Sequence, residues 1–354
     1  MNLKKFGYSE KLEKIRIENE LTGFEIGRII TEHKERYVVY TEKGEFDAEI
    51  TGNLRYTAKG KIDFPAVGDW VALATYDNLA IIHKILPRFS IIKRKAVGQS
   101  GEIQVIAANI DYAFLVQAAT QDFNINRLER YLTICNSSKV KPIIVISKVD
   151  LIEETMIDEL KQMISSRIND IPIFAISNES KFGYSEIINF MRKGKTYCLL
   201  GSSGVGKSSL LNNLSGNSKM RTDEISKSTN KGRHITSHRE LFIIDNGAIL
   251  IDNPGMREVG IADSGKGLEI TFDPILKLAH KCKYKDCTHT SEIGCAVIEA
   301  LENGEIDELS YQNYLKMLKE KEHFEASAFR RRQKDKEFGK MLKNYKKDKK
   351  KNKF

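Results

Sequence analysis

One stretch of eight residues constrains the fold of this chain more than any other. Residues 201–208 read G-S-S-G-V-G-K-S and fit the pattern G-x-x-x-x-G-K-[ST] at every fixed position. The apolar run Tyr197–Leu200 precedes them and predicts a strand, and residues 209–214 predict the start of a helix. A strand, a glycine-rich turn and a helix in this order let backbone amides converge on an anion. The stretch therefore predicts a phosphate-binding loop rather than an ordinary Gly/Ser turn.

The side chains of this loop have separate expected roles. Lys207 is expected to reach the β- and γ-phosphates of a nucleotide, and the Ser208 hydroxyl is expected to bind Mg²⁺. Further nucleotide contacts are expected from Gly201, Ser202, Ser203, Gly204, Val205, Gly206 and Ser209. The cofactor that these residues predict is Mg²⁺ bound together with the nucleotide.

A second motif follows the apolar run Pro142–Ile146, which predicts a buried strand. Residues 147–150 read S-K-V-D and resemble the guanine-reading motif N/T-K-x-D. Asp150 is expected to accept two hydrogen bonds from guanine, and Lys148 is expected to lie across the base. Adenine has the wrong donors and would leave a buried carboxylate unpaired. Ser147 stands where Asn or Thr is usual, which predicts weaker local bracing, and S-K-x-D by itself could also start a helix.

Two further segments complete the expected hydrolysis site. The motif D-N-P-G begins with Asp252, expected to hold Mg²⁺ through water, and ends with Gly255, whose amide is expected to meet the γ-phosphate. The alternative is a plain turn. Between this motif and the phosphate loop, K-G-R-H-I-T-S-H predicts a switch segment in which Thr236 binds Mg²⁺. Because Met256 cannot orient a water molecule, His234 is the predicted water-positioning residue.

The five cysteines fall into two groups. Cys135 and Cys198 stand alone within apolar segments and are expected to be buried. The other three lie with a histidine in the pattern C-x4-C-x-H-x5-C, formed by Cys282, Cys287, His289 and Cys295. Three thiolates and one imidazole suit a tetrahedral, structural Zn²⁺ ion. His280, two residues before Cys282, could compete for the histidine position but is expected to be a bystander.

The rest of the sequence predicts a multidomain chain, in keeping with its 354 residues. Five short runs rich in β-formers lie between residues 24 and 86, with turn signals between them, and predict a small barrel. The pattern fits an OB-like or an SH3-like barrel equally well. From residue 105 onward, apolar strands alternate with helices, which predicts a mostly parallel sheet covered on both faces. Helical patterns dominate after residue 265.

The net charge of +9 is concentrated at the C-terminal end, where residues 330–354 hold 13 Lys/Arg and 3 Asp/Glu. Such a tail predicts binding to a polyanion, and the alternative is a solvated tail that aids solubility. The sequence has no uninterrupted apolar run long enough to span a bilayer, and residues 1–14 lack the apolar centre of a secretion signal. We therefore expect a cytoplasmic protein.

The order of the motifs is unusual for a GTPase. The base-reading motif at residues 147–150 precedes the phosphate loop at residues 201–208, whereas ordinary GTPases have the reverse order. The same sheet can form when a chain is opened at one surface loop and its ends are joined elsewhere. The sequence thus predicts a circularly permuted GTPase, and in that arrangement Ser177 falls in the loop behind the guanine.

The combined features resemble the ribosome small subunit-dependent GTPase A family (RsgA, also called YjeQ). The resemblance covers residues 24–325 and includes V-G-D-W-V at residues 67–71, G-R-H-x-T in the switch, and the cysteine–histidine spacing. It implies a bacterial GTPase that binds the immature small ribosomal subunit, contacts rRNA through its barrel and zinc domains, and hydrolyses GTP faster on the subunit. It further implies that His234 is catalytic and that the cysteine–histidine cluster binds zinc.

The expected fold is an N-terminal OB-like β-barrel, a central α/β circularly permuted P-loop GTPase domain, and a C-terminal, mostly α zinc-binding domain. The expected boundaries are 1–92 for the N-terminal extension and barrel, 93–104 for a linker, 105–265 for the GTPase domain, 266–329 for the zinc domain and 330–354 for the basic tail. We expect a monomer that binds GTP or GDP and the small ribosomal subunit with its rRNA, without a membrane. The alternative is an RNA-binding assembly scaffold whose GTP site only switches its affinity.

Overall fold

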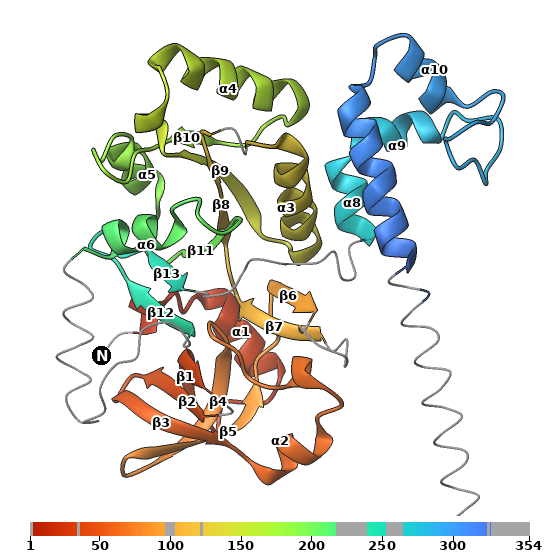
Figure 1. Cartoon of the computed structure of the whole chain (residues 1–354). Helices are drawn as coiled ribbons and strands as arrows, with labels where there is room; N and C mark the ends of the chain where they lie inside the picture. Colours follow the sequence, from red (N-terminus) through yellow and green to blue (C-terminus); the bar gives the residue numbers. More distant parts are fainter. Residues whose placement is uncertain are drawn as a thin grey trace, which may run out of the picture.

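The computed structural model contains three units, which are joined along one sheet and one helix interface (Figure 1). The described residues are 3–33, 36–95, 103–120, 123–216, 239–252, 265–323 and 326. An N-terminal barrel adjoins a central sheet that carries helices, and a C-terminal group of helices lies beside the central unit.

The N-terminal unit is a closed five-stranded barrel. Its strands are β1 (Glu25–His33), β2 (Arg36–Thr41), β3 (Gly44–Ile50), β4 (Trp70–Tyr76) and β5 (Leu79–Ile85). They pair in the order β1-β2-β3-β5-β4, and β4 pairs again with β1, while β3 and β5 are parallel. This closed order is OB-like, so the structure decides between the two barrel types that the sequence left open.

Short helices surround the barrel. They are η1 (Leu3–Phe6), α1 (Glu10–Glu18), α2 (Gly52–Thr57) and η2 (Lys61–Asp63). The Thr51 hydroxyl caps α2 by accepting a hydrogen bond from the Leu54 amide, which is why a helix begins where Gly52 suggested only a turn.

The central sheet has five parallel strands in the order β10-β9-β8-β11-β13. They are β8 (Tyr112–Ala118), β9 (Lys141–Ser147), β10 (Ile173–Ala175), β11 (Thr196–Leu200) and β13 (Ile249–Asp252). Two helices pack on each face: α3 (Ile125–Ser138) and α4 (Glu154–Arg167), and α5 (Tyr184–Phe190) and α6 (Lys207–Ser215). The predicted parallel sheet covered on both faces is confirmed, and burial on both faces explains why its strands are almost wholly apolar.

The barrel and the central sheet are continuous through β12 (Arg239–Ile243). This strand is antiparallel both to β13 and to β1, so that the two units share one 11-stranded sheet. β12 and β13 follow each other in the sequence and form an antiparallel hairpin.

The fully buried Arg28 of β1 ties the barrel to its neighbours. Its guanidinium donates to the Phe6 carbonyl, to the Gly68 carbonyl at 3.3 Å and to Thr196 Oγ1 of β11 at 2.9 Å. The ring of Trp70 lies 5.3 Å from the guanidinium carbon. Burial lowers the pKa of Arg28 to about 10, so the group remains charged at neutral pH. One side chain thus joins the N-terminal segment, the barrel and the strand that leads into the phosphate loop.

The prediction that residues 93–104 form a loop is wrong at both ends of the segment. Residues 93–95 belong to β6 (Ile91–Lys95) and residues 103–104 to β7 (Ile103–Ala108), and the two strands form an antiparallel pair. Only the parts of these strands outside the segment are strongly apolar, with Ile92 and Ala107 fully buried. The polar ends therefore gave no periodic signal, although backbone hydrogen bonds continue through them.

The C-terminal unit is helical, as predicted. Its helices are α8 (Gly265–Thr271), α9 (Asp273–Ala279), α10 (Ala296–Glu302) and a helix over residues 308–323. Leu268, Phe272, Val297 and Met317 form its apolar core. Among the described residues, no helix has the length and apolar character needed to cross a bilayer.

A buried carboxylate anchors the C-terminal unit to the central one. Glu129 of α3 is 2% exposed and accepts hydrogen bonds from Arg167 Nη2 of α4 at 2.8 Å and from Asn313 Nδ2 at 2.6 Å. The hydroxyl of Ser310 adds a third donor at 3.0 Å. Because Ser310 and Asn313 lie on the helix over residues 308–323, this network fixes that helix against α3.

Candidate nucleotide and metal sites

The phosphate-loop residues follow the buried strand β11 and lead directly into α6, as predicted. Gly201 lies so close to β8 that a Cβ atom there would be 2.4 Å from the Val116 carbonyl oxygen. Gly206 ends the loop with a φ of 87°, which glycine adopts without strain. These two glycines allow the tight turn that a backbone cradle for phosphate requires.

Lys207 points back across this loop. Its Nζ donates to the Gly201 carbonyl at 2.8 Å and to the Ser202 carbonyl. Ser208 and Ser209 follow on the first turn of α6 and are exposed. A lysine ammonium, two exposed hydroxyls and the N-terminal end of a helix are thus assembled at one point, an arrangement that can bind a polyphosphate and its metal ion.

The base-reading motif is connected directly to the phosphate loop. Ser147, at the end of β9, is fully buried, and its Oγ donates to the Val205 carbonyl at 2.6 Å. Ser147 thus braces the phosphate loop through its hydroxyl group.

Lys148 and Asp150 extend from the same end of the sheet. Lys148 has a φ of 58°, and this left-handed conformation turns the chain out of β9 into the short helix η3 (Val149–Leu151). Asp150 lies in η3 and is exposed. Its carboxylate is accessible to a ligand that approaches from the carboxyl ends of the strands, where ligands bind in open parallel sheets.

The loop after β10 also meets the phosphate loop. The buried Ser177 Oγ accepts hydrogen bonds from the amides of Glu179 and Ser180 at 3.2 and 3.1 Å, which shapes the turn. Asn178 Nδ2 donates to the Gly206 carbonyl at 3.2 Å. The three loops that follow β9, β10 and β11 are therefore linked by hydrogen bonds at one edge of the sheet.

Asp252 ends β13, the parallel neighbour of β11, and thus lies at the same edge of the sheet. The remaining predicted site residues, Gly255, His234 and Thr236, lie outside the described residues.

Two contacts of the phosphate loop were not predicted from the sequence. Asn178 lies next to Ser177 in the loop expected behind the guanine, but neither its contact with the phosphate loop nor that of Arg127 follows from a sequence motif. Arg127 Nη1 of α3 donates to Ser202 Oγ at 3.3 Å. No local pattern identifies either residue, because both reach the loop from elements that the fold alone brings near it.

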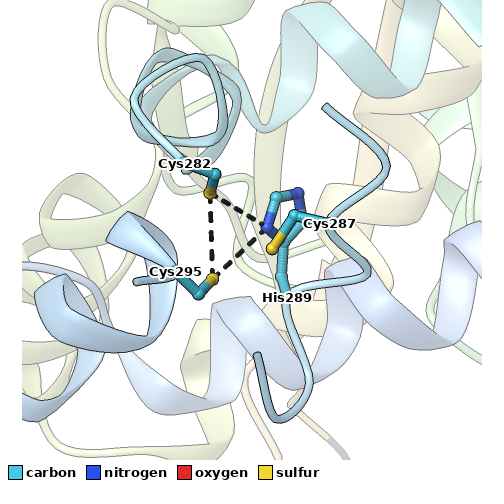
Figure 2. A group of neighbouring side chains, drawn as sticks. All are labelled: Cys282, Cys287, His289 and Cys295. Carbon is cyan, nitrogen blue, oxygen red and sulfur yellow. Dashed lines mark hydrogen bonds between the residues drawn. The ribbon is translucent and has the colours of Figure 1, made fainter. Parts of the chain in front are cut away.

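The four predicted metal ligands come together in the C-terminal unit (Figure 2). Their ligand atoms all lie within 4.8 Å of one another. Cys282 Sγ is 3.8 Å from Cys295 Sγ, and each of these sulfur atoms is 3.5 Å from His289 Nδ1. A tetrahedron with Zn–S bonds of about 2.3 Å and a Zn–N bond of about 2.0 Å has edges of about 3.8 and 3.5 Å. The spacing therefore fits one tetrahedral metal ion.

The surrounding residues hold the ligands in place. Glu292 accepts hydrogen bonds from the Thr288 hydroxyl at 2.6 Å and from the amides of Thr288, Thr290 and Ser291 at 2.7 to 3.1 Å. The bonds from the Thr288 hydroxyl, and from the Thr288 and Ser291 amides, hold the pKa of Glu292 well below the usual range. Tyr311 donates to the His289 carbonyl from the helix over residues 308–323. The cluster is thus built into a preformed loop.

The chemistry of the cluster also suits a metal ion. Burial acts to raise the pKa of the Cys282 thiol, but hydrogen bonds from the Ala296 and Val297 amides and from Cys295 and Cys287 lower it, whereas desolvation raises the pKa of the Cys287 thiol to about 12. Burial lowers the pKa of His289, which favours the neutral imidazole that binds metal. His280 is not part of the group of residues that could hold the ion, so the alternative ligand is not supported.

A parallel sheet whose base-reading motif precedes its phosphate loop defines this molecule as a circularly permuted P-loop GTPase. A sequence model of the RsgA GTPase family matches residues 85–262. The chain belongs to this family. A model of the ABC transporter family also matches, over residues 187–353, a range that includes the phosphate loop common to many nucleotide-binding proteins.

Relatives match almost the whole chain. Small ribosomal subunit biogenesis GTPase RsgA 1 of Bacteroides thetaiotaomicron is 39% identical over 353 residues, with 98% of each chain covered. Small ribosomal subunit biogenesis GTPase RsgA 2 of Lactiplantibacillus plantarum is 41% identical over 324 residues, covering 90% of this chain and 89% of the relative. The likeness therefore includes the barrel and the C-terminal unit as well as the GTPase domain.

Two solved structures resemble this fold over most of the chain. YjeQ from Thermotoga maritima has a TM-score of 0.61 and 25% identity, covering 84% of this chain and 98% of that one. YloQ, described as a circularly permuted GTPase, has a TM-score of 0.59 and 27% identity, covering 85% of this chain and 96% of that one.

Proposed function

We propose that this GTPase acts in late maturation of the small ribosomal subunit and that the subunit stimulates its GTP hydrolysis. The observation that carries the proposal is the alignment of 98% of the chain with a relative named for small ribosomal subunit biogenesis. The OB-like barrel belongs to a class that binds oligonucleotides. The 13 Lys/Arg in residues 330–354 suit an RNA backbone.

The loops at the carboxyl ends of β9 and β10 bind the guanine base. Asp150 accepts hydrogen bonds from the base, Lys148 lies across its face, and the turn shaped by Ser177 lies behind it. Lys207 and the amides of the phosphate loop bind the β- and γ-phosphates. The exposure of Asp150 and the hydrogen bonds between these loops support the assignment.

Mg²⁺ is held by Ser208, Thr236 and Asp252, and the Gly255 amide meets the γ-phosphate. His234 orients the attacking water molecule. The charge that develops in the transition state is offset by the metal ion and by Lys207. Intrinsic turnover is slow in this scheme, because subunit binding brings the switch into its active arrangement.

One Zn²⁺ bound by the four ligands Cys282, Cys287, His289 and Cys295 stabilises the C-terminal unit, and its role is structural because protein ligands fill all four positions. The further parts of the proposal are a monomeric, cytoplasmic protein and the division into an N-terminal extension and barrel (1–92), a GTPase domain (105–265), a zinc domain (266–329) and a basic tail (330–354).

GTP turnover with and without purified small ribosomal subunits tests this function, with ATP and large subunits as controls. Strong stimulation of GTP hydrolysis by small subunits alone is the expected result. Nucleotide-dependent binding without stimulated turnover would instead indicate an RNA-binding scaffold whose GTP site only switches affinity.

The role of His234 is tested by His234→Ala in the same assay. Stimulated turnover is expected to fall by about 10²-fold or more, the scale of a lost general acid–base group. GDP affinity should be retained. Near wild-type stimulated turnover would remove His234 from the mechanism.

A further inference from the structure

β12 lies between β13, which ends in Asp252, and β1 of the barrel, and all three strands belong to one continuous sheet (Figure 1). Its residue Glu240 is in register with Asp252 of β13 on one side and with Thr31 of β1 on the other. A single row of paired residues therefore leads from the barrel to Asp252. Strands paired in this way move together, because the hydrogen bonds of the ladder limit their relative displacement.

One ion pair joins β1 and β12 beside this row. Arg239 Nη1 lies 3.0 Å from Glu32 Oε2 and also donates to the Val105 carbonyl at 2.9 Å. The side chains of Arg239 and Glu32 are only 12% and 24% exposed, so the pair is less screened by solvent and salt than a surface pair. Burial raises the pKa of Glu32, and the charge of Arg239 opposes this shift.

The pair lies between two functional regions. Glu32 is next to the end of the β1–β2 hairpin, where His33 pairs with Arg36. In OB-like barrels, the connection between the first two strands is a common contact for oligonucleotides. On the other side, Arg239 follows the predicted switch segment directly in the sequence.

We propose that Glu32 and Arg239 are positioning residues that couple RNA contact at the β1–β2 end of the barrel to the nucleotide site. This inference rests on the proposed function, because it concerns the stimulation of turnover by the subunit. The pair keeps β12 attached to β1, so that a displacement of the barrel strand reaches Asp252 along the paired row. It acts on the stimulated rate and not on nucleotide affinity.

The test compares GTP turnover of Glu32→Gln, Arg239→Gln and the charge-reversed double variant Glu32→Arg/Arg239→Glu with and without small subunits. In the single variants, stimulated kcat is expected to fall by about 5- to 150-fold, the usual range of a coupling between sites. Basal turnover and KM for GTP should not change, and the double variant should recover stimulation. Glu25→Gln is the matched control, because Glu25 lies on β1 like Glu32 but away from β12, and the substitution breaks its 2.6 Å ion pair with Lys43.

Two results of this assay would overturn the coupling. One is unchanged stimulation in the single variants, and the other is an equal loss of basal and stimulated turnover, which indicates damage to the site itself. A loss of stimulation in Glu25→Gln as large as in Glu32→Gln would also contradict it.

If small subunits do not stimulate GTP turnover of the wild-type protein, the proposed function is wrong. The coupling between β1 and the nucleotide site can then still be tested without subunits. The row of paired residues links local opening of β1 to the nucleotide site even without subunits. A non-hydrolysable GTP analogue with Mg²⁺ should therefore slow amide hydrogen exchange at residues 31–33 in the wild type but not in Glu32→Gln. Equal exchange in both proteins would refute the inference.

Discussion

A single hydroxyl group joins the base-reading motif to the phosphate loop. Ser147 is fully buried and donates to the Val205 carbonyl at 2.6 Å. Asn or Thr is usual at this position, but the short serine side chain is sufficient because the end of β9 and the loop lie within hydrogen-bonding distance. The Ser147 hydroxyl supplies the hydrogen-bond donor at this position.

Ser147→Ala tests this contact. The substitution leaves the carbonyl of Val205, a residue 6% exposed, without its donor, which costs about 1–3 kcal/mol. GTP and GDP affinity should therefore fall by at least about fivefold, as measured by titration with a fluorescent guanine nucleotide. Ser147→Thr keeps the hydroxyl and serves as the control. Equal affinity of the alanine variant and the wild type would show that the contact does not shape the loop.

The isolated cysteines behave as buried apolar residues, as predicted. Cys135 and Cys198 are fully buried, and burial raises the pKa of the Cys198 thiol to about 12 and that of Cys135 well above its usual value. Both thiols therefore stay protonated at pH 8 in the folded state.

Thiol titration at pH 8 checks this protection. In the native protein after metal chelation, only the three cysteines of the metal cluster are expected to react, whereas all five should react in denaturant. Because a raised pKa keeps the thiolate scarce below that pKa, reactivity of Cys198 should increase only toward pH 12. Rapid reaction of five thiols in the folded protein would contradict the burial of Cys135 and Cys198.

The helix α3 contacts the sheet, the phosphate loop and two helices of the C-terminal unit. Its apolar side covers the sheet, Arg127 contacts the phosphate loop, and Glu129 anchors the helix over residues 308–323. The opposite side contacts α8, where Gly267 fits against the backbone of α3. Periodicity predicts the apolar side of such a helix, but the polar contacts depend on which elements the fold places next to it.

Gly267→Ala tests the contact between α8 and α3. A Cβ atom at this position would lie 2.3 Å from the Thr133 carbonyl oxygen and 2.0 Å from Ser137 Oγ. The overlap with backbone should cost about 1–3 kcal/mol, more than the gain of up to about 1 kcal/mol in helix propensity. Urea unfolding should show the loss of stability.

Gly52→Ala is the control for this variant, because no atom lies within 4 Å of the added Cβ in α2. It should leave stability nearly unchanged. Comparable unfolding midpoints for Gly267→Ala and Gly52→Ala would show that α8 does not approach α3 as closely as described.

On the scale of the whole molecule, two different kinds of connection hold the three units together. The barrel and the central unit share one sheet and the buried Arg28. The C-terminal unit is attached through polar side chains around Glu129 and through the close approach of α8 to α3, and it carries its own apolar core. The C-terminal unit should therefore lose its structure more independently than the barrel does.

Metal removal tests this independence. Chelation or Cys282→Ser should unfold the loop over residues 282–295 and lower the helix content, because the ligands join α10 to the preceding helices. GDP affinity should be retained, since the nucleotide site lies in the central unit. Circular dichroism and nucleotide titration measure the two effects, and metal analysis should give one zinc per wild-type chain. A loss of GDP binding together with the loss of helix content would contradict the structural independence of the C-terminal unit.

The sequence by itself determined the features that depend on local order: the strand, loop and helix around residues 201–208, the placement of Asp150 after β9, and the cluster of four candidate metal ligands. These signals are local because backbone geometry links neighbouring residues to a helix, a strand or a turn. The parallel sheet could also be predicted, since its strands must be apolar on both faces.

Only the tertiary structure decided the closed OB-like order of the barrel, the strand ends at residues 93–95 and 103–104, and the contacts of Arg28, Arg127 and Asn178. It also placed β12 between β1 and β13, with Glu32 against Arg239. Each of these features joins residues far apart in the chain. Their pairing depends on the register and packing of complete elements, and the local spacing of residue types does not encode it.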